Sequence, residues 1–139
     1  MTIATKRIQI NTNGHADTSN VTTDISREVN NSGINSGIVT VFIPGSTAGI
    51  CTIEYEPGLV SDIKDMWERL VPSNLNYEHN KAWGDENGHS HVRSSLLGTS
   101  ITIPFVSKRL TLGTWQQVVI VDFDNRPRSR EIILQIIGE

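Results

Sequence analysis

The sequence lacks the features that mark several common classes of protein. One cysteine in 139 residues cannot form an internal disulfide, so we expect a reducing, cytoplasmic location. No apolar run approaches the roughly 18 residues of a transmembrane helix, and the first residues lack the apolar stretch of a signal peptide. Acidic residues outnumber basic ones by 15 to 12, whereas nucleic-acid binders usually carry a strongly basic face. We therefore expect neither a membrane nor a nucleic acid as partner.

The chain also has no internal repeat, no low-complexity tract and no linker rich in proline or glycine. With 37% hydrophobic and 19% charged residues, it has enough apolar material for one core and is too evenly mixed for a disordered chain. A length of 139 residues is that of one typical domain. We therefore expect a single domain over residues 1–139.

Hydrophobic periodicity predicts mostly β-structure. Six segments have the alternating or continuous apolar pattern of strands: 6–11, 37–43, 50–55, 99–105, 118–124 and 131–137. Two segments have helical spacing, 21–29 and 57–70, and the polar segment 74–88 reads as a loop. Residues 124–127 are predicted to form a hairpin turn. The expected fold class is α+β: a compact single domain with sandwich-like antiparallel sheets and one or two helices.

Three of the four histidines, His79, His89 and His91, lie within one short window. On a strand or extended loop, His-x-His places both imidazoles on the same side. Three neutral imidazoles suit a transition metal such as zinc and leave one coordination position open for water or substrate. Nearby carboxylates, including Glu54 and Asp85, could complete the ligand set. The alternative is that these are ordinary loop histidines.

Other segments admit both a binding and a structural interpretation. Residues 45–49 are small and polar between two apolar strands, which favours either a close approach to a ligand or a tight connection. Residues 91–98 predict a short helix, which either holds an anion or is simply structural. The cluster Arg126, Arg128 and Arg130 suits phosphate or carboxylate, or is a solvated hairpin tip. Trp115 is expected to be a core or interface anchor, and Cys51 to be buried and inert.

Several motifs together resemble one family. Asn-Gly-His-Ser-His-Val-Arg-Ser-Ser-Leu-Leu-Gly-Thr-Ser at 87–100 is followed by Ile-Pro-Phe at 103–105, Gly-Thr-Trp-Gln at 113–116 and Asp-Phe-Asp at 122–124. This set is similar to the YjbQ-like family, also named secondary thiamine-phosphate synthase enzyme. The resemblance runs from about residue 37 to the C-terminus.

The resemblance implies a β-rich α+β subunit that assembles as a homotrimer, with a histidine-lined metal pocket near a subunit boundary. Its implied metal ligands for a divalent ion, zinc being the expected one, are His79, His89 and His91. Glu54 matches an acidic residue of the family and Arg93 replaces a usual lysine, so these two are the expected catalytic residues. The expected ligand-binding residues are Ser46, Thr47, Asn87, Gly88 and Arg128. Asp62 matches an aspartate of the long helix.

The sequence departs from the family at one position. Gly45 stands where many members have the histidine of His-Thr-Thr-Ala, so an activity that needs this histidine would not carry over.

Three functions follow. The first is a metal-dependent enzyme resembling thiamine-phosphate synthase, which condenses a pyrimidine diphosphate with a thiazole phosphate. The second is a metal-dependent hydrolase of a small phosphorylated metabolite, with Glu54 or Glu78 as general base. The third is a non-catalytic trimeric protein that binds a metal or small ligand.

Overall fold

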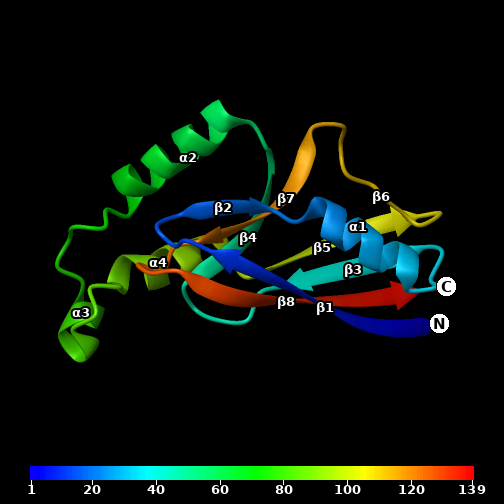
Figure 1. The fold of residues 1–139 in the computed structure, drawn as a ribbon, viewed down its shortest axis with the longest axis horizontal. Coiled ribbons are helices and arrows are strands. Elements are labelled where there is room, and N and C mark those ends of the chain that lie inside the picture. The colour runs from blue at the N-terminus through cyan, green and yellow to red at the C-terminus, as the bar shows by residue number, and fades with distance from the viewer.

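The computed structural model describes residues 1–139 as two antiparallel sheets and four helices (Figure 1). The larger sheet has the strand order β1-β8-β3-β5-β6, and the smaller one β2-β7-β4. The larger sheet consists of β1 (Thr2–Thr12), β8 (Arg128–Gly138), β3 (Gly37–Phe42), β5 (Ser100–Val106) and β6 (Arg109–Leu110). The smaller sheet consists of β2 (Asp17–Asn20), β7 (Gln116–Asp122) and β4 (Ala48–Glu54). Strands β7 and β8, which are adjacent in sequence, therefore belong to different sheets.

The helices are α1 (Thr22–Asn31), α2 (Pro57–Leu70), α3 (Glu78–Trp83) and α4 (Gly88–Leu97). Helix α1 lies against the sheets, whereas α2, α3 and α4 gather at the opposite end of the molecule (Figure 1). The Glu56 carboxylate caps α2 by accepting hydrogen bonds from the N–H groups of Gly58 and Leu59, which lowers the pKa of Glu56. None of the four helices combines the length and apolar character needed to cross a membrane.

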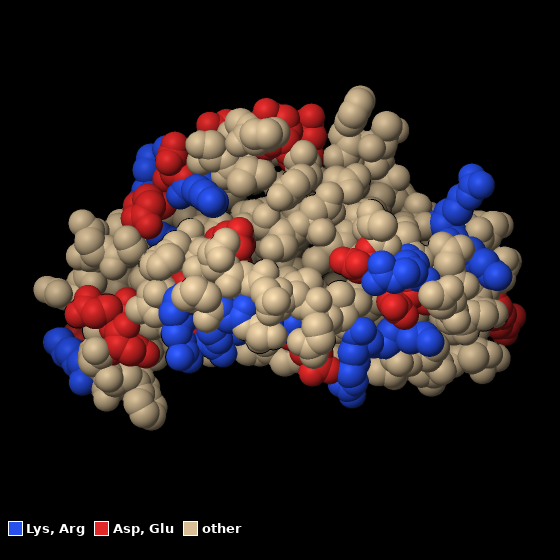
Figure 2. Space-filling view, in the orientation of Figure 1, with Lys and Arg blue, Asp and Glu red and all other residues tan.

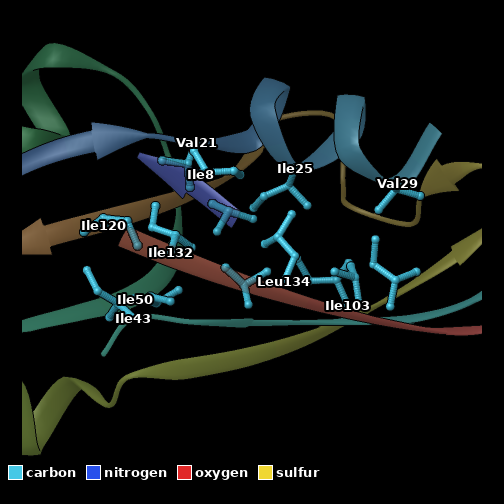
Figure 3. Close-up of a cluster of buried hydrophobic side chains, with 14 of the residues drawn as sticks. Ile8, Val21, Ile25, Val29, Ile43, Ile50, Ile103, Ile120, Ile132 and Leu134 are labelled. Atoms are coloured by element: carbon cyan, nitrogen blue, oxygen red, sulfur yellow. The ribbon is translucent and has the colours of Figure 1, made fainter. Parts of the chain in front are cut away.

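The main core consists of 17 buried side chains from both sheets, α1 and the connections next to them (Figure 3). Strand β8 alternates between buried and half-buried positions, so that Ile132, Leu134 and Ile136 all point into this core. From α1, Ile25 and Val29 are fully buried at a four-residue spacing, as one stripe of a helix requires. This alternation fixes the register of β8 between its two neighbours.

A second, smaller core joins the helical end to the end of β7. It contains Trp67 of α2 and Phe123, whose rings meet edge to face with centroids 4.9 Å apart. The guanidinium carbon of Arg93 lies 5.9 Å from the centre of the Phe123 ring. These contacts hold α2 and α4 against the segment that leaves β7.

The predicted α+β fold with antiparallel sheets is confirmed, and helix 57–70 has the predicted bounds. Two local predictions are wrong, and a third is wrong in part. The predicted loop 74–88 contains α3. Residues 124–127 connect two sheets instead of closing a hairpin, because β7 and β8 do not pair. Trp115 does not anchor the core, since it is 74% exposed beside β7, and its alternative role as an interface anchor stays a prediction.

Candidate functional site

A polar cavity of about 480 Å³ lies where three connections meet. Residues 45–47 follow β3, residues 85–91 include the start of α4, and residues 124–130 join β7 to β8. None of its lining residues is hydrophobic; they are Gly45, Ser46, Thr47, Asp85, Asn87, His91, Asp124, Asn125, Arg126, Arg128 and Arg130. A cavity with this lining suits a small, strongly polar ligand.

A buried ion pair forms one wall of the cavity. The Arg130 guanidinium donates to both Asp122 oxygens, from Nε and Nη2, at 2.8 Å each, and Nη2 also donates to Thr47 Oγ1 at 2.7 Å. Burial alone would raise the pKa of Asp122, but hydrogen bonds from Arg130 and Thr12 hold it below its ordinary value. Asp122 is therefore charged at neutral pH, and the pair fixes the position of Thr47.

Asp124, only 2% exposed, ties the three connections together. Its carboxylate accepts hydrogen bonds from Arg128 Nη1 at 2.6 Å, Thr47 Oγ1 at 3.0 Å and Asn87 Nδ2 at 3.3 Å. The Asn87 side-chain oxygen in turn accepts a hydrogen bond from the Ser90 hydroxyl. This network sets the shape of the cavity before any ligand arrives.

The three arginines differ in how much of their donor capacity is free. Arg130 is engaged by Asp122 and Thr47, and Arg128 uses Nη1 for Asp124. Arg126 is exposed and makes no ion pair or side-chain hydrogen bond. Figure 2 shows lysine or arginine side chains at the surface near the beginning of β8. Arg126, together with the remaining N–H groups of Arg128, therefore offers the cavity's available positive charge.

His91 and His79 form a pair at the cavity. Their ring centroids lie 4.2 Å apart with an interplanar angle of 37°, and only His91 lines the cavity. The Nδ1 atom of His79 lies 3.7 Å from Asp85 Oδ1. Burial, and then the neighbouring His79, lower the pKa of His91. His91 is therefore a neutral imidazole at pH 7, able to accept a proton.

His89 does not join this pair. Both His89 and His91 belong to α4, and successive residues on a helix are about 100° apart, so the two rings point to roughly opposite sides. His89 is buried, its ring centroid is 6.5 Å from that of Tyr77, and its Nδ1 has no hydrogen-bond partner. Burial, and then Arg93, lower its pKa. The expectation that His-x-His places both rings on one side is wrong, because it assumed an extended segment.

The three histidines consequently do not fit a single metal-ligand set. No group of three or more His, Cys, Asp or Glu side chains in the chain is arranged to hold a metal ion. The closest approach to such a set is His79 with His91 and Asp85, where the two rings are tilted by 37° with centroids 4.2 Å apart and His79 Nδ1 lies 3.7 Å from Asp85 Oδ1.

The structure brings four of the five expected ligand-binding residues to the cavity: Ser46, Thr47, Asn87 and Arg128. The fifth, Gly88, starts α4, where a Cβ would collide with the side chain of Tyr77. Its role in the structure is to let α4 begin against that ring.

The two expected catalytic residues lie outside the cavity. Glu54 is exposed at the end of β4. Arg93 is 2% exposed and donates to the Val71 carbonyl and, at 2.8 Å, to Glu68. This hydrogen bond lowers the pKa of Glu68. Both catalytic roles stay predictions, and Arg93 visibly joins α2 to α4.

Sequence reasoning did not single out Asp122 and Asp124, the two carboxylates that organise the site. The signal was present in the Asp-x-Asp at 122–124 followed by alternating arginines at 128 and 130. Side chains two apart on a strand share a face, so each pattern presents one row of like charge. Their pairing could not be read from the sequence, because it depends on how the chain crosses between the sheets.

A β-rich α+β domain with an arginine-lined polar cavity at its helical end is the class of protein that this fold and site define. Comparison with known proteins gives the family. The chain belongs to the family of UPF0047 proteins, YjbQ-like, whose model matches residues 6–139.

Two groups of relatives show the extent of the similarity. A UPF0047 protein of Methanothermobacter thermautotrophicus is 36% identical over 139 residues, covering 100% of this chain and 95% of that protein. The crystal structure of a YbjQ-like protein of unknown function from Sulfolobus solfataricus has a TM-score of 0.94 at 30% identity and covers 99% of both chains. A hypothetical protein from Aeropyrum pernix has a TM-score of 0.91 at 31% identity, covering 98% of this chain and 99% of that one.

Proposed function

We propose that this protein is an enzyme that binds a small phosphorylated metabolite in the arginine-lined cavity and uses His91 for proton transfer. The observation that carries the proposal is the lining itself. One cavity without a single hydrophobic lining residue places three arginines, the loop Gly45–Thr47 and a histidine around the same space. Arginine is suited to phosphate because its planar fork of N–H donors matches the phosphate oxygens.

The contribution of each part follows from its bonds. Arg126 and the free N–H groups of Arg128 meet the anion, while Asp122 and Asp124 hold Arg130 and Arg128 in place. Asp85 and Asp124 in the wall, with Asp122 behind it, equal the three arginines in formal charge. The affinity for phosphate therefore rests mainly on the unpaired Arg126. His91 lies on the same cavity and, since its pKa is lowered, acts as a general base at neutral pH.

The reaction is either hydrolysis or transfer. In a hydrolase, His91 would take a proton from the attacking water. In a condensation resembling that of thiamine-phosphate synthase, the arginines would neutralise the departing pyrophosphate. The cavity has no aromatic or aliphatic lining residue for a pyrimidine or thiazole ring, which favours hydrolysis or transfer on a polar substrate. A divalent metal, with zinc as the expected ion, and a homotrimer stay predictions.

The test is isothermal titration calorimetry with inorganic phosphate and pyrophosphate. Arg126→Gln should lower the affinity for both by about tenfold or more, as expected for loss of a charge-assisted hydrogen bond. The matched control is Arg109→Gln, because Arg109 is also exposed and unpaired but lies on β6 outside the cavity. Equal affinities in wild type and Arg126→Gln would contradict the proposal.

Catalysis is tested separately from binding. His91→Gln should still bind phosphate and should lose turnover of phosphate esters. If the wild type binds phosphate but neither hydrolyses phosphate esters nor condenses a pyrimidine diphosphate with a thiazole phosphate, the result contradicts the proposed catalysis and favours the third function, a non-catalytic binding protein. Repeating the titrations after EDTA treatment shows whether the anion is held through a metal.

A further inference from the structure

A second hollow, of about 270 Å³, adjoins the arginine-lined cavity. The two share Gly45, Ser46 and His91. We call the first the arginine lobe and the second the hydroxyl lobe, which is lined by Gly45, Ser46, His91, Ser94, Ser95, Gly98 and Thr99. The hydroxyl lobe has no hydrophobic lining residue and no carboxylate, lysine or arginine. It is therefore suited to a neutral, polar group.

Gly45 lies at the boundary between the lobes, because it lines both of them. Its φ of +122° is a backbone conformation that residues with a side chain rarely adopt. Apart from the two neighbouring residues of the chain, a Cβ at position 45 would meet one heavy atom within 4 Å. That atom is Nη1 of Arg130, at 3.1 Å. Glycine at position 45 therefore keeps the boundary between the lobes free of a side chain that would crowd Arg130.

The hydroxyl groups of the second lobe are only partly used by the protein. Ser94 Oγ is committed to the Ala48 carbonyl at 2.6 Å. Ser95 Oγ donates to the His91 carbonyl at 3.0 Å and keeps its lone pairs as acceptors. The hydroxyls of Ser46 and Thr99 make no hydrogen bond within the protein, whereas the neighbouring hydroxyls of Thr47 and Ser94 do. Up to three hydroxyls can therefore pair with a ligand that carries hydroxyls of its own.

We propose that the substrate is a phosphate ester of a hydroxylated carbon chain, that is, a sugar phosphate or polyol phosphate. The phosphate lies in the arginine lobe, the hydroxylated part lies in the hydroxyl lobe, and His91 faces the junction between them. This inference rests on the proposed function, because it assumes that the arginine lobe holds a phosphate. It adds the chemical class of the rest of the substrate and makes Thr99 a specificity-determining residue.

The test compares three ligands by calorimetry: inorganic phosphate, phenyl phosphate and ribose 5-phosphate. The wild type should bind ribose 5-phosphate about tenfold more tightly than either of the others, since one or two added hydrogen bonds contribute about threefold to tenfold each. Thr99→Val preserves the shape of the side chain and removes its hydroxyl. This variant should lower the affinity for ribose 5-phosphate about threefold to tenfold and leave the affinity for inorganic phosphate unchanged within twofold.

Two further variants make the result specific. Ser95→Ala should also lower the affinity for ribose 5-phosphate and leave that for inorganic phosphate unchanged, because it removes an acceptor from the same lobe. The control is Thr2→Val, the same change at an exposed position of β1 outside both lobes. It should alter the affinity for neither ligand. Far-ultraviolet circular dichroism of each variant checks that the fold is intact.

The outcomes separate this inference from the proposed function. If phosphate binds through Arg126 but ribose 5-phosphate binds no more tightly than inorganic phosphate, the inference is wrong and the proposed function stands. The inference is also wrong if Thr99→Val weakens both ligands equally, or if phenyl phosphate binds best. If none of the three ligands depends on Arg126, both proposals are wrong.

Discussion

The buried pair of Arg130 and Asp122 is the residue-scale feature on which the cavity depends. Their side chains are 5% and 0% exposed, and the pair also holds the Thr47 hydroxyl. A charge that is left unpaired in such a place is costly, because burial strips it of water and nothing replaces the lost partner. The pair therefore serves to fix the wall of the cavity more than to add stability.

We expect Arg130→Met to destabilise the fold by about 3–5 kcal/mol at neutral pH, because it leaves the Asp122 carboxylate buried without a cation. Hydrogen bonds from Arg130 lower the pKa of Asp122 in the wild type, so the pair stabilises the fold above the ordinary pKa of an aspartate. This stabilisation is lost as the pH falls through the lowered value. The difference in free energy of unfolding between wild type and variant should therefore become smaller as the pH falls, because Asp122 of the variant becomes protonated.

Urea unfolding at several pH values measures this difference. The control is Arg7→Met, which breaks the exposed ion pair with Glu131 and should cost less than about 1 kcal/mol. A deficit that stays constant from neutral to acidic pH would contradict the role given to Asp122.

At the scale of elements, the start of α4 decides which histidines reach the cavity. Gly88 is the first residue of the helix and packs against Tyr77, and its N–H donates to the Asn80 side chain. The helix that follows turns His91 toward the cavity and His89 into the interior. A strand at this position would have placed both rings on one face.

Gly88→Ala tests this arrangement. Alanine is the better helix former by up to about 1 kcal/mol, but its methyl group would collide with Tyr77. Because overpacking at buried positions typically costs about 1–3 kcal/mol, we expect the collision to prevail and the variant to be less stable. Thermal unfolding measures the change. The control is Gly113→Ala, where a Cβ meets only ordinary contacts with Gln116. A stabilised Gly88→Ala variant would show that the close approach is not required.

The elements also show what the sequence can and cannot tell. Long periodic segments, such as helix 57–70 and strand 131–137, are predicted well because many residues contribute to one pattern. The helix predicted over 91–98 is confirmed as the greater part of α4, whereas α3 and the start of α4 are short polar stretches that the pattern does not mark as helical. The orientation of His89 and His91 depends on α4 beginning at Gly88, three residues before the predicted helix. The predicted metal site therefore depended on a helix start that the sequence does not mark.

At the scale of the whole molecule, the site is formed by three connections that are far apart in the sequence. Residues 45–47, 85–91 and 124–130 meet because β7 and β8 lie in different sheets and the chain crosses between them at this end (Figure 1). Single residues of the cavity, such as Ser46, Asn87 and Arg128, could be chosen from the sequence. That these residues meet in one cavity could not be predicted from the sequence, because it depends on how the strands are connected between the two sheets.

The central claim is that an anion binds beside His91, and nuclear magnetic resonance of the histidine rings tests it most directly. Burial and His79 lower the pKa of His91 in the free protein, whereas a phosphate held by Arg126 would stabilise the imidazolium. We therefore predict that saturating inorganic phosphate raises the pKa of His91. In Arg126→Gln the same phosphate concentration should have little effect. A His91 titration that is identical with and without phosphate would contradict the account.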